Sequence, residues 1–221
     1  MGPYCFPLII ECCMLSIEHS CSFDHPEFSI LNTQCSTFNE SGFGFLINLI
    51  NQFAELSLQK KPMSITIGQK APDFTLYNTE KKPVSLSDFA GKKNVLLLFF
   101  PLAFTSTCTK ELCDVRDDIG TYENEHTQVL GISVDSTYTL AKYKEEQHYN
   151  YPLLSDFNKT ASTIYDTVYE SFGSMAMQGV SKRSAFIIDK QGVVKYAEVL
   201  ENASNVPDFR AIREVLERLS I

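Results

Sequence analysis

The feature that most constrains the fold of this chain is a continuous apolar run at residues 94–100, followed by apolar residues at helical spacing. The run reads NVLLLFF and shows no alternation of polar and apolar side chains, which is typical of a strand covered on both faces. The residues after it recur every three or four positions and would form one buried stripe of a helix. They are Cys108, Leu112, Val115, Ile119 and Tyr122. A doubly covered strand with a helix packed on it predicts the α/β class.

The remainder of the chain continues this alternation. Further strands are predicted at 128–134, 151–154, 184–189 and 193–199, and further helices at 138–147, 159–165 and 207–219. The alternation implies parallel pairing through right-handed crossovers, whereas a turn at residues 190–192 predicts an antiparallel hairpin near the end. The sequence therefore predicts a mixed central sheet with helices on both faces.

The first 62 residues differ from the rest in composition. Residues 1–58 contain no Lys or Arg and hold five of the seven cysteines. Periodic structure begins only after Lys60, Lys61 and Pro62. We therefore predict one domain at 63–221 and an N-terminal extension at 1–62, which is either flexible or translated from an upstream start.

Several classes of function and location are disfavoured by composition. The net charge of −8, without a Lys or Arg cluster, argues against a nucleic-acid partner. The apolar run at residues 6–10 has no basic region before it, ends at Glu11 and is too short to span a bilayer. We therefore expect no membrane anchor and no secretion, and a cytoplasmic protein with reduced thiols. We also expect no cofactor.

The cysteines and histidines of the extension fit no zinc-binding spacing that we can justify, so no metal site is expected there. They are Cys12, Cys13, His19, Cys21, His25 and Cys35.

Cys108 lies where the first buried strand gives way to the helix. The free N–H groups and the positive end of the dipole at a helix N-terminus favour an anion, so a cysteine there is more readily a thiolate. A thiolate can attack one oxygen of a peroxide, become a sulfenic acid and expel water or an alcohol. Peroxide reduction is thus one chemistry that this position favours.

Pro101, Thr105 and Cys108 form the pattern Pro-x-x-x-Thr-x-x-Cys, which resembles the active-site motif of the peroxiredoxins. The segment 182–189, KRSAFIID, resembles the part of that family that carries an essential arginine, here Arg183. Residues 67–74, IGQKAPDF, resemble the family's start of an N-terminal hairpin. The resemblance covers nearly all of the predicted domain. It implies a thioredoxin-like fold and a peroxidase recycled by thioredoxin or another thiol.

The resemblance also implies roles for individual residues. The Thr105 hydroxyl would hydrogen-bond the peroxide, Pro101 would shield the thiolate from water, and Arg183 would stabilise the thiolate and the developing negative charge. Glu111 and Arg116 resemble a subgroup pattern that holds the arginine through an ion-pair network. The alternative for these two is an exposed pair on the helix.

Cys113 resembles the second cysteine of the Q-type, or bacterioferritin-comigratory, peroxiredoxins, because it stands five residues after Cys108. No cysteine follows it, so resolution by a C-terminal cysteine of a partner subunit is not expected. On an intact helix the two Cα atoms would be roughly 8.6 Å apart, beyond the reach of about 7 Å for a disulfide. Resolution through Cys113 therefore requires the start of the helix to unwind. The alternative is one-cysteine chemistry with an external thiol, since parts of the chain also resemble E-type peroxiredoxins.

Two readings from other classes of function remain open. A thiol–disulfide oxidoreductase is possible on the same fold, although its usual Cys-x-x-Cys motif does not occur here. A noncatalytic binding module would leave Cys108 no more reactive than free cysteine. Phe104 would serve either a homodimer contact, as in many peroxiredoxins, or the lining of the pocket.

Overall fold

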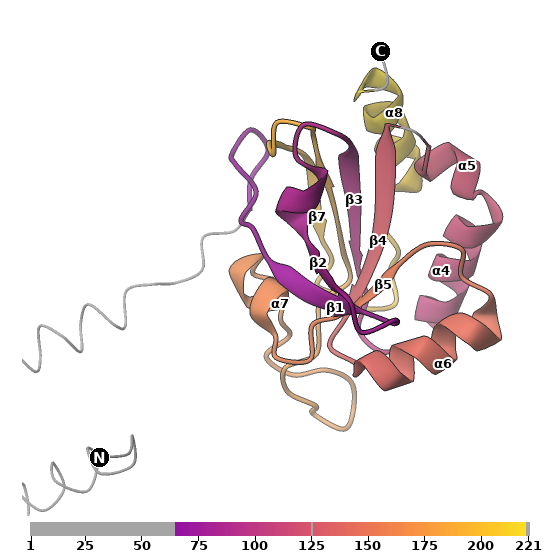
Figure 1. Ribbon diagram of the computed structural model, residues 1–221. Helices are drawn as coiled ribbons and strands as arrows, with labels where there is room; N and C mark the ends of the chain where they lie inside the picture. Colours follow the sequence, from indigo (N-terminus) through magenta and orange to yellow (C-terminus); the bar gives the residue numbers. More distant parts are fainter. Residues whose placement is uncertain (1–64, 125, 220–221) are drawn as a thin grey trace, which may run out of the picture. The chain divides into compact units, whose positions relative to one another are not determined.

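Seven strands form one mixed sheet in the order β2-β1-β5-β4-β3-β6-β7 (Figure 1). The structure is a computed structural model that describes residues 65–124 and 126–219. The strands are β1 (Thr75–Asn78), β2 (Pro83–Ser85), β3 (Asn94–Phe99), β4 (Thr127–Ser133), β5 (Leu153–Ser155), β6 (Ser184–Ile188) and β7 (Val194–Val199). The helices are η2 (Leu86–Phe89), α4 (Ser106–Asp117), α5 (Ile119–Tyr122), α6 (Thr137–Gln147), α7 (Thr160–Ile164) and α8 (Phe209–Leu219). The N-terminal extension predicted at 1–62 lies outside the described residues.

The strand β3 lies at the centre of the sheet and is buried along its whole length. It pairs in parallel with β4 and antiparallel with β6, while β4 pairs in parallel with β5. The strands β6 and β7 form the predicted antiparallel hairpin. The prediction of a mixed α/β sheet is therefore confirmed.

Successive side chains of β3 enter two different apolar cores, as the period of a strand requires. Leu96 and Leu98 pack with residues of α4, α6 and α8 on one face, whereas Leu97 and Phe99 pack with residues of η2 and α7 on the other. Figure 1 shows α4, α6 and α8 together on one side of the sheet and α7 on the opposite side. Coverage of both faces explains why the sequence of β3 shows no alternation.

The apolar stripe predicted as one helix is divided into α4 and α5. The break is at Asp118, whose backbone leaves the helical conformation with φ −116° and ψ 34°. Its side chain accepts a hydrogen bond from the Thr121 hydroxyl at 2.8 Å. Short polar side chains that bond locally in this way compete with helix continuation.

The hairpin of β1 and β2 was not assigned from the sequence beyond the resemblance at residues 67–74. The strands are four and three residues long and are exposed or half-buried at all positions except Leu76, so they have no long apolar pattern. Among the described residues, no helix combines the length and the apolar character needed to cross a lipid bilayer.

Candidate active site

Cys108 lies in the first turn of α4, just beyond the end of the central strand. Thr105, the residue before the helix, is extended, and its hydroxyl donates to the Leu102 carbonyl at 2.9 Å instead of capping the helix. The first helical bond runs from the Thr109 N–H to the Thr105 carbonyl at 2.9 Å. The first turn of α4 therefore keeps N–H groups that no capping side chain occupies, a favourable setting for an anion.

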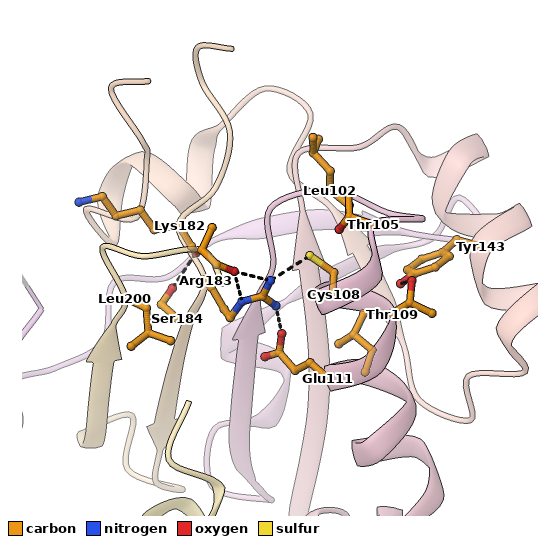
Figure 2. Close-up of polar contacts among 12 residues, drawn as sticks. Leu102, Thr105, Cys108, Thr109, Glu111, Tyr143, Lys182, Arg183, Ser184 and Leu200 are labelled. Carbon is orange, nitrogen blue, oxygen red and sulfur yellow. Dashed lines mark hydrogen bonds and ion pairs between the residues drawn. The ribbon is translucent and has the colours of Figure 1, made fainter. Parts of the chain in front are cut away.

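Arg183 contacts Cys108 although 75 positions separate them in the sequence. The antiparallel register places Ser184 of β6 opposite Phe99 of β3, so Arg183 lies beside the chain that leaves β3. Its Nη2 donates to Cys108 Sγ at 3.2 Å (Figure 2). Both residues are 1% exposed. A buried guanidinium in contact with sulfur stabilises the thiolate over the thiol through a charge-assisted hydrogen bond.

Two further partners fix the guanidinium of Arg183. Its Nε and Nη2 donate to the Ala203 carbonyl at 3.2 and 3.0 Å, and its Nη1 forms an ion pair with Glu111 Oε2. Figure 2 shows the guanidinium between the carboxylate and the sulfur. Because the fork is planar and its donors are engaged on several sides, the arginine has little freedom to turn away from Cys108.

Glu111 is fully buried in α4 and faces Arg183. Burial raises the pKa of its carboxyl to about 7, and the charge and the hydrogen bond of Arg183 limit this rise. Glu111 thus lies at Arg183, as the ion-pair network expected from the sequence requires.

Arg116 does not join this network, which corrects the expectation for that residue. It pairs with Asp117 at 2.7 Å and donates to the Gln147 carbonyl. Five residues along an α-helix correspond to a rotation of about 140° from Glu111, so the two side chains leave α4 in different directions. Arg116 instead connects α4 to the end of α6.

Cys113 is half-buried on α4 and lies away from Arg183. Its Sγ is 3.7 Å from Gln147 Oε1 and 3.9 Å from the Tyr149 hydroxyl. Both Cys108 and Cys113 are free thiols. The intact α4 therefore holds Cys113 as a packing residue in this conformation.

The loop from residue 101 to residue 105 is held by a residue that the sequence reasoning missed. Asp135, just after β4, accepts hydrogen bonds from the Ala103 N–H and the Ser133 hydroxyl, both at 2.7 Å. Pro101 is buried at the start of the loop. Because β3 and β4 are parallel and adjacent, an acidic residue directly after β4 was a signal for this contact.

Phe104 lies in the same loop with a positive φ of 62°. Its ring centroid is 4.8 Å from that of Tyr143, whose hydroxyl is 2.9 Å from Thr109 Oγ1. Phe104 nevertheless remains 49% exposed. It therefore has apolar surface available beyond its contact with Tyr143.

Known proteins resemble this chain over the same region. The AhpC/TSA family matches residues 67–197. Alkyl hydroperoxide reductase E of Mycobacterium tuberculosis is 35% identical over 157 residues, which are 71% of this chain and 99% of the relative. The chloroplastic 2-cysteine peroxiredoxin of Chattonella marina var. antiqua is 35% identical over 167 residues, which cover 71% of this chain and 80% of the relative.

Solved structures of peroxiredoxins share the fold of this chain. Peroxidoxin BcpB of Mycobacterium tuberculosis has a TM-score of 0.59 and 29% identity, covering 71% of this chain and 97% of that structure. The reduced 2-Cys peroxiredoxin of Plasmodium vivax has a TM-score of 0.61 and 28% identity, covering 71% of this chain and 82% of that structure. The predicted thioredoxin-like fold is thereby confirmed. Because the family match spans more than half of the chain and a 35% identical relative is matched over almost its whole length, the chain belongs to the AhpC/TSA family of peroxiredoxins, the thiol-dependent peroxidases.

Proposed function

We propose that Cys108 is the thiolate that reduces the peroxide, both hydrogen peroxide and organic hydroperoxides. The observation that carries this proposal is the 3.2 Å contact of Arg183 Nη2 with Cys108 Sγ in a buried site. The thiolate sulfur forms a bond to one peroxide oxygen while the O–O bond breaks. The departing oxygen takes up a proton and leaves as water or an alcohol, and Cys108 becomes a sulfenic acid.

Arg183 acts both before and during the attack on the peroxide. Its guanidinium stabilises the thiolate before attack, and it remains in place to stabilise the negative charge that develops on the oxygens. Glu111 acts as a positioning residue, because its carboxylate holds Nη1 while Nη2 faces the sulfur. A preorganised donor of this kind need not reorient during the reaction.

Thr105 and Pro101 complete the proposed site. The Thr105 hydroxyl donates to the Leu102 carbonyl, so its lone pairs remain available to accept a hydrogen bond from the peroxide. Pro101 is buried at the start of the loop, and its proposed role is to shield the thiolate from water.

A peroxide consumption assay separates the proposal from the readings in other classes. With a simple thiol as reductant and no disulfide substrate, the protein should consume peroxide catalytically. A thiol–disulfide oxidoreductase or a noncatalytic binding module would consume no more peroxide than the thiol does alone. Peroxide consumption no faster than that of the thiol alone would contradict the proposed function.

We propose that Cys113 resolves the sulfenic acid by forming a disulfide with Cys108. The first turns of α4 must unwind for this step. Unwinding would break the contact between Thr109 and Tyr143 and the pair between Glu111 and Arg183. The cost of losing these contacts is the argument for the alternative, in which an external thiol resolves Cys108.

Cys113→Ser should distinguish the two resolution mechanisms. Under internal resolution, one equivalent of peroxide gives a Cys108–Cys113 disulfide in the unmodified protein, seen by peptide mapping without reductant. The variant should complete its first turnover, lose recycling by thioredoxin, and accumulate sulfenic and then sulfinic acid on Cys108. Normal cycling of the variant with a low-molecular-weight thiol, and no internal disulfide in the parent protein, would establish the one-cysteine mechanism instead.

The partners and the location of the protein follow from the same proposal. Thioredoxin is the proposed reductant, because a disulfide in an unwound helix start is accessible for exchange. The exposed part of the Phe104 ring is the proposed contact of a homodimer. A cytoplasmic location fits thiols that must be kept reduced.

We propose that residues 63–221 form the functional domain, because the sheet, its helices and the site residues all lie within the described part of that range. A chain that starts at Met63 should keep its peroxidase rate and its melting temperature nearly unchanged, because every strand of the sheet and every proposed site residue lies after Met63. Activity and thermal unfolding of the full and shortened chains provide the check. Insoluble or inactive shortened protein would show that the extension is required.

A further inference from the structure

The loop that leads to Cys108 is tied to the sheet through the end of β4. The Ala103 N–H donates to Asp135 Oδ2 at 2.7 Å, and the Ser133 hydroxyl lies 3.4 Å from the Pro101 carbonyl oxygen. Ser133 also fixes the carboxylate, because its hydroxyl donates to Asp135 Oδ2 at 2.7 Å and accepts from the Asp135 N–H at 3.1 Å. The position of the Asp135 carboxylate is therefore set by β4 and not by the loop.

The backbone of Asp135 is also held from the neighbouring strand. Ser155, the last residue of β5, donates its hydroxyl to the Asp135 carbonyl at 2.6 Å. The Asp156 N–H donates to the Ser133 carbonyl at 2.7 Å. Asp135 is thus a half-buried acceptor that two strands hold in a fixed place beside the loop.

The loop needs such an anchor because its backbone is strained. Phe104 has a φ of 62°, in the left-handed region that bulky side chains rarely adopt. Such a conformation persists only where the surrounding structure imposes it. Phe104 stands directly between Ala103, which is bonded to Asp135, and Thr105. Loss of the bond to Asp135 would let Phe104 relax, and rotation of its backbone would turn Thr105.

Thr105 and Arg183 serve the proposed reaction from different parts of the fold. The Thr105 hydroxyl is oriented by its bond to the Leu102 carbonyl at 2.9 Å, within the loop, and Figure 2 shows it at the end of α4 that carries Cys108. Arg183 reaches Cys108 from the start of β6 and is fixed by Glu111. Release of the loop should therefore disturb the proposed peroxide contact while the partner of the thiolate stays in place.

We propose that Asp135 is a positioning residue for the peroxide. Through Ala103 and the strained Phe104, it holds the Thr105 hydroxyl where the peroxide binds, and it thereby favours peroxide over other electrophiles that attack the same thiolate. This inference rests on the proposed function of Cys108 and Thr105.

Two reactions of Cys108 separate this role from a general loss of the site. With peroxide, the O–O bond must be oriented by its hydrogen bonds. With iodoacetamide, the thiolate displaces iodide from carbon and needs no such orientation. Asp135→Ala should slow the oxidation of Cys108 about 10- to 100-fold, the scale of a misplacement of about 1 Å, and should leave its alkylation within about threefold. Mass spectrometry of the Cys108 peptide follows both rates in the reduced full-length protein.

The matched controls test the acceptor and the stability separately. Asp135→Asn keeps an acceptor oxygen for the Ala103 N–H and should restore the oxidation rate to within about threefold. Ser136→Ala removes the side-chain cap of α6, where the Ser136 hydroxyl accepts from the Thr139 N–H at 3.1 Å. It should lower the melting temperature and leave the oxidation rate within about twofold.

Two further variants test the path to Thr105. Ser133→Ala removes a partner of the carboxylate and should slow oxidation about 3- to 10-fold without slowing alkylation, which decides the question if Asp135→Ala does not fold. Thr105→Val removes the hydroxyl itself. Adding Asp135→Ala to Thr105→Val should then cost less than about a further twofold, because residues that act as one unit are not additive.

The proposal would be overturned by a normal oxidation rate in Asp135→Ala and Ser133→Ala, by equal slowing of oxidation and alkylation, or by additive losses with Thr105→Val. An Asp135→Asn protein as slow as Asp135→Ala would also contradict it. Failure of the proposed function is a different result, because Cys108 of the unmodified protein would then react with peroxide no faster than free cysteine.

Discussion

Cys108→Ser should abolish peroxidase turnover. A serine hydroxyl at this position has no accessible anion to attack the O–O bond, whereas the fold should tolerate the exchange of one small side chain for another. The measurement is peroxide consumption with an excess of thiol reductant, compared with the thiol alone.

Two controls make the result for Cys108→Ser specific. Circular dichroism and thermal unfolding should show that the variant retains its fold. Cys113→Ser should still react with the first equivalent of peroxide, because Cys113 lies beside Gln147 and Tyr149 and away from Arg183. Turnover that survives in Cys108→Ser would remove the basis of the assignment.

Arg183→Ala should lower the rate of the peroxide reaction by about 10²–10³, the scale for removing one preorganised donor that stabilises developing charge. Arg183→Lys should fall in between. Lysine keeps the charge but lacks the planar fork, so it cannot hold Sγ, Glu111 and the Ala203 carbonyl together. Stopped-flow measurement of the reaction between reduced protein and peroxide gives these rates directly.

Arg183→Ala also affects stability, and the two effects can be separated. Losing one partner of a buried ion pair costs about 3–5 kcal/mol when the other charge stays unpaired. The pKa of Glu111, already raised to about 7 by burial, allows that carboxyl to protonate and lowers this cost. The double variant Arg183→Ala/Glu111→Gln removes the charge altogether, so it should regain stability without regaining rate.

Lys182→Ala is the matched control for position. Lys182 is adjacent in sequence, but its Nζ is paired with Glu201 at 2.6 Å. Its removal should leave the peroxide rate within about twofold, since such partly exposed pairs contribute only about 0–1 kcal/mol. A normal rate in Arg183→Ala, or an equal loss in Lys182→Ala, would show that the 3.2 Å contact with Cys108 does not drive the reaction.

The central part of the fold could be predicted because its physical signals are strong. The apolar run of β3 and the hairpin of β6 and β7 are long, regular patterns. The pairing of β3 with β6, which brings the chain before Cys108 next to Arg183, is seen only in the structure. The strand-to-helix junction made Cys108 a candidate for a reactive thiolate without any knowledge of distant contacts. The strands β1 and β2 carry no comparable pattern because they are short and only one of their side chains, Leu76, is buried.

The directions of side chains on α4 were harder to predict than its existence. Glu111 and Arg116 are both near Cys108 in the sequence, yet only Glu111 lies on the face that meets Arg183. Their separation of about 140° around the helix decides this once the position of β6 is known. Asp135 was missed for a related reason, since its contact with Ala103 depends on the adjacency of β3 and β4.

The most direct test of the account is to find the atom that peroxide oxidises and the speed of that oxidation. Reduced Cys113→Ser protein is mixed with one equivalent of peroxide and a reagent that traps sulfenic acids, and the adduct is mapped by mass spectrometry. The account predicts an adduct on Cys108, formed orders of magnitude faster than the oxidation of free cysteine and slowed by about 10²–10³ in Arg183→Ala. An adduct on another cysteine, or oxidation of Cys108 no faster than that of free cysteine, would contradict it.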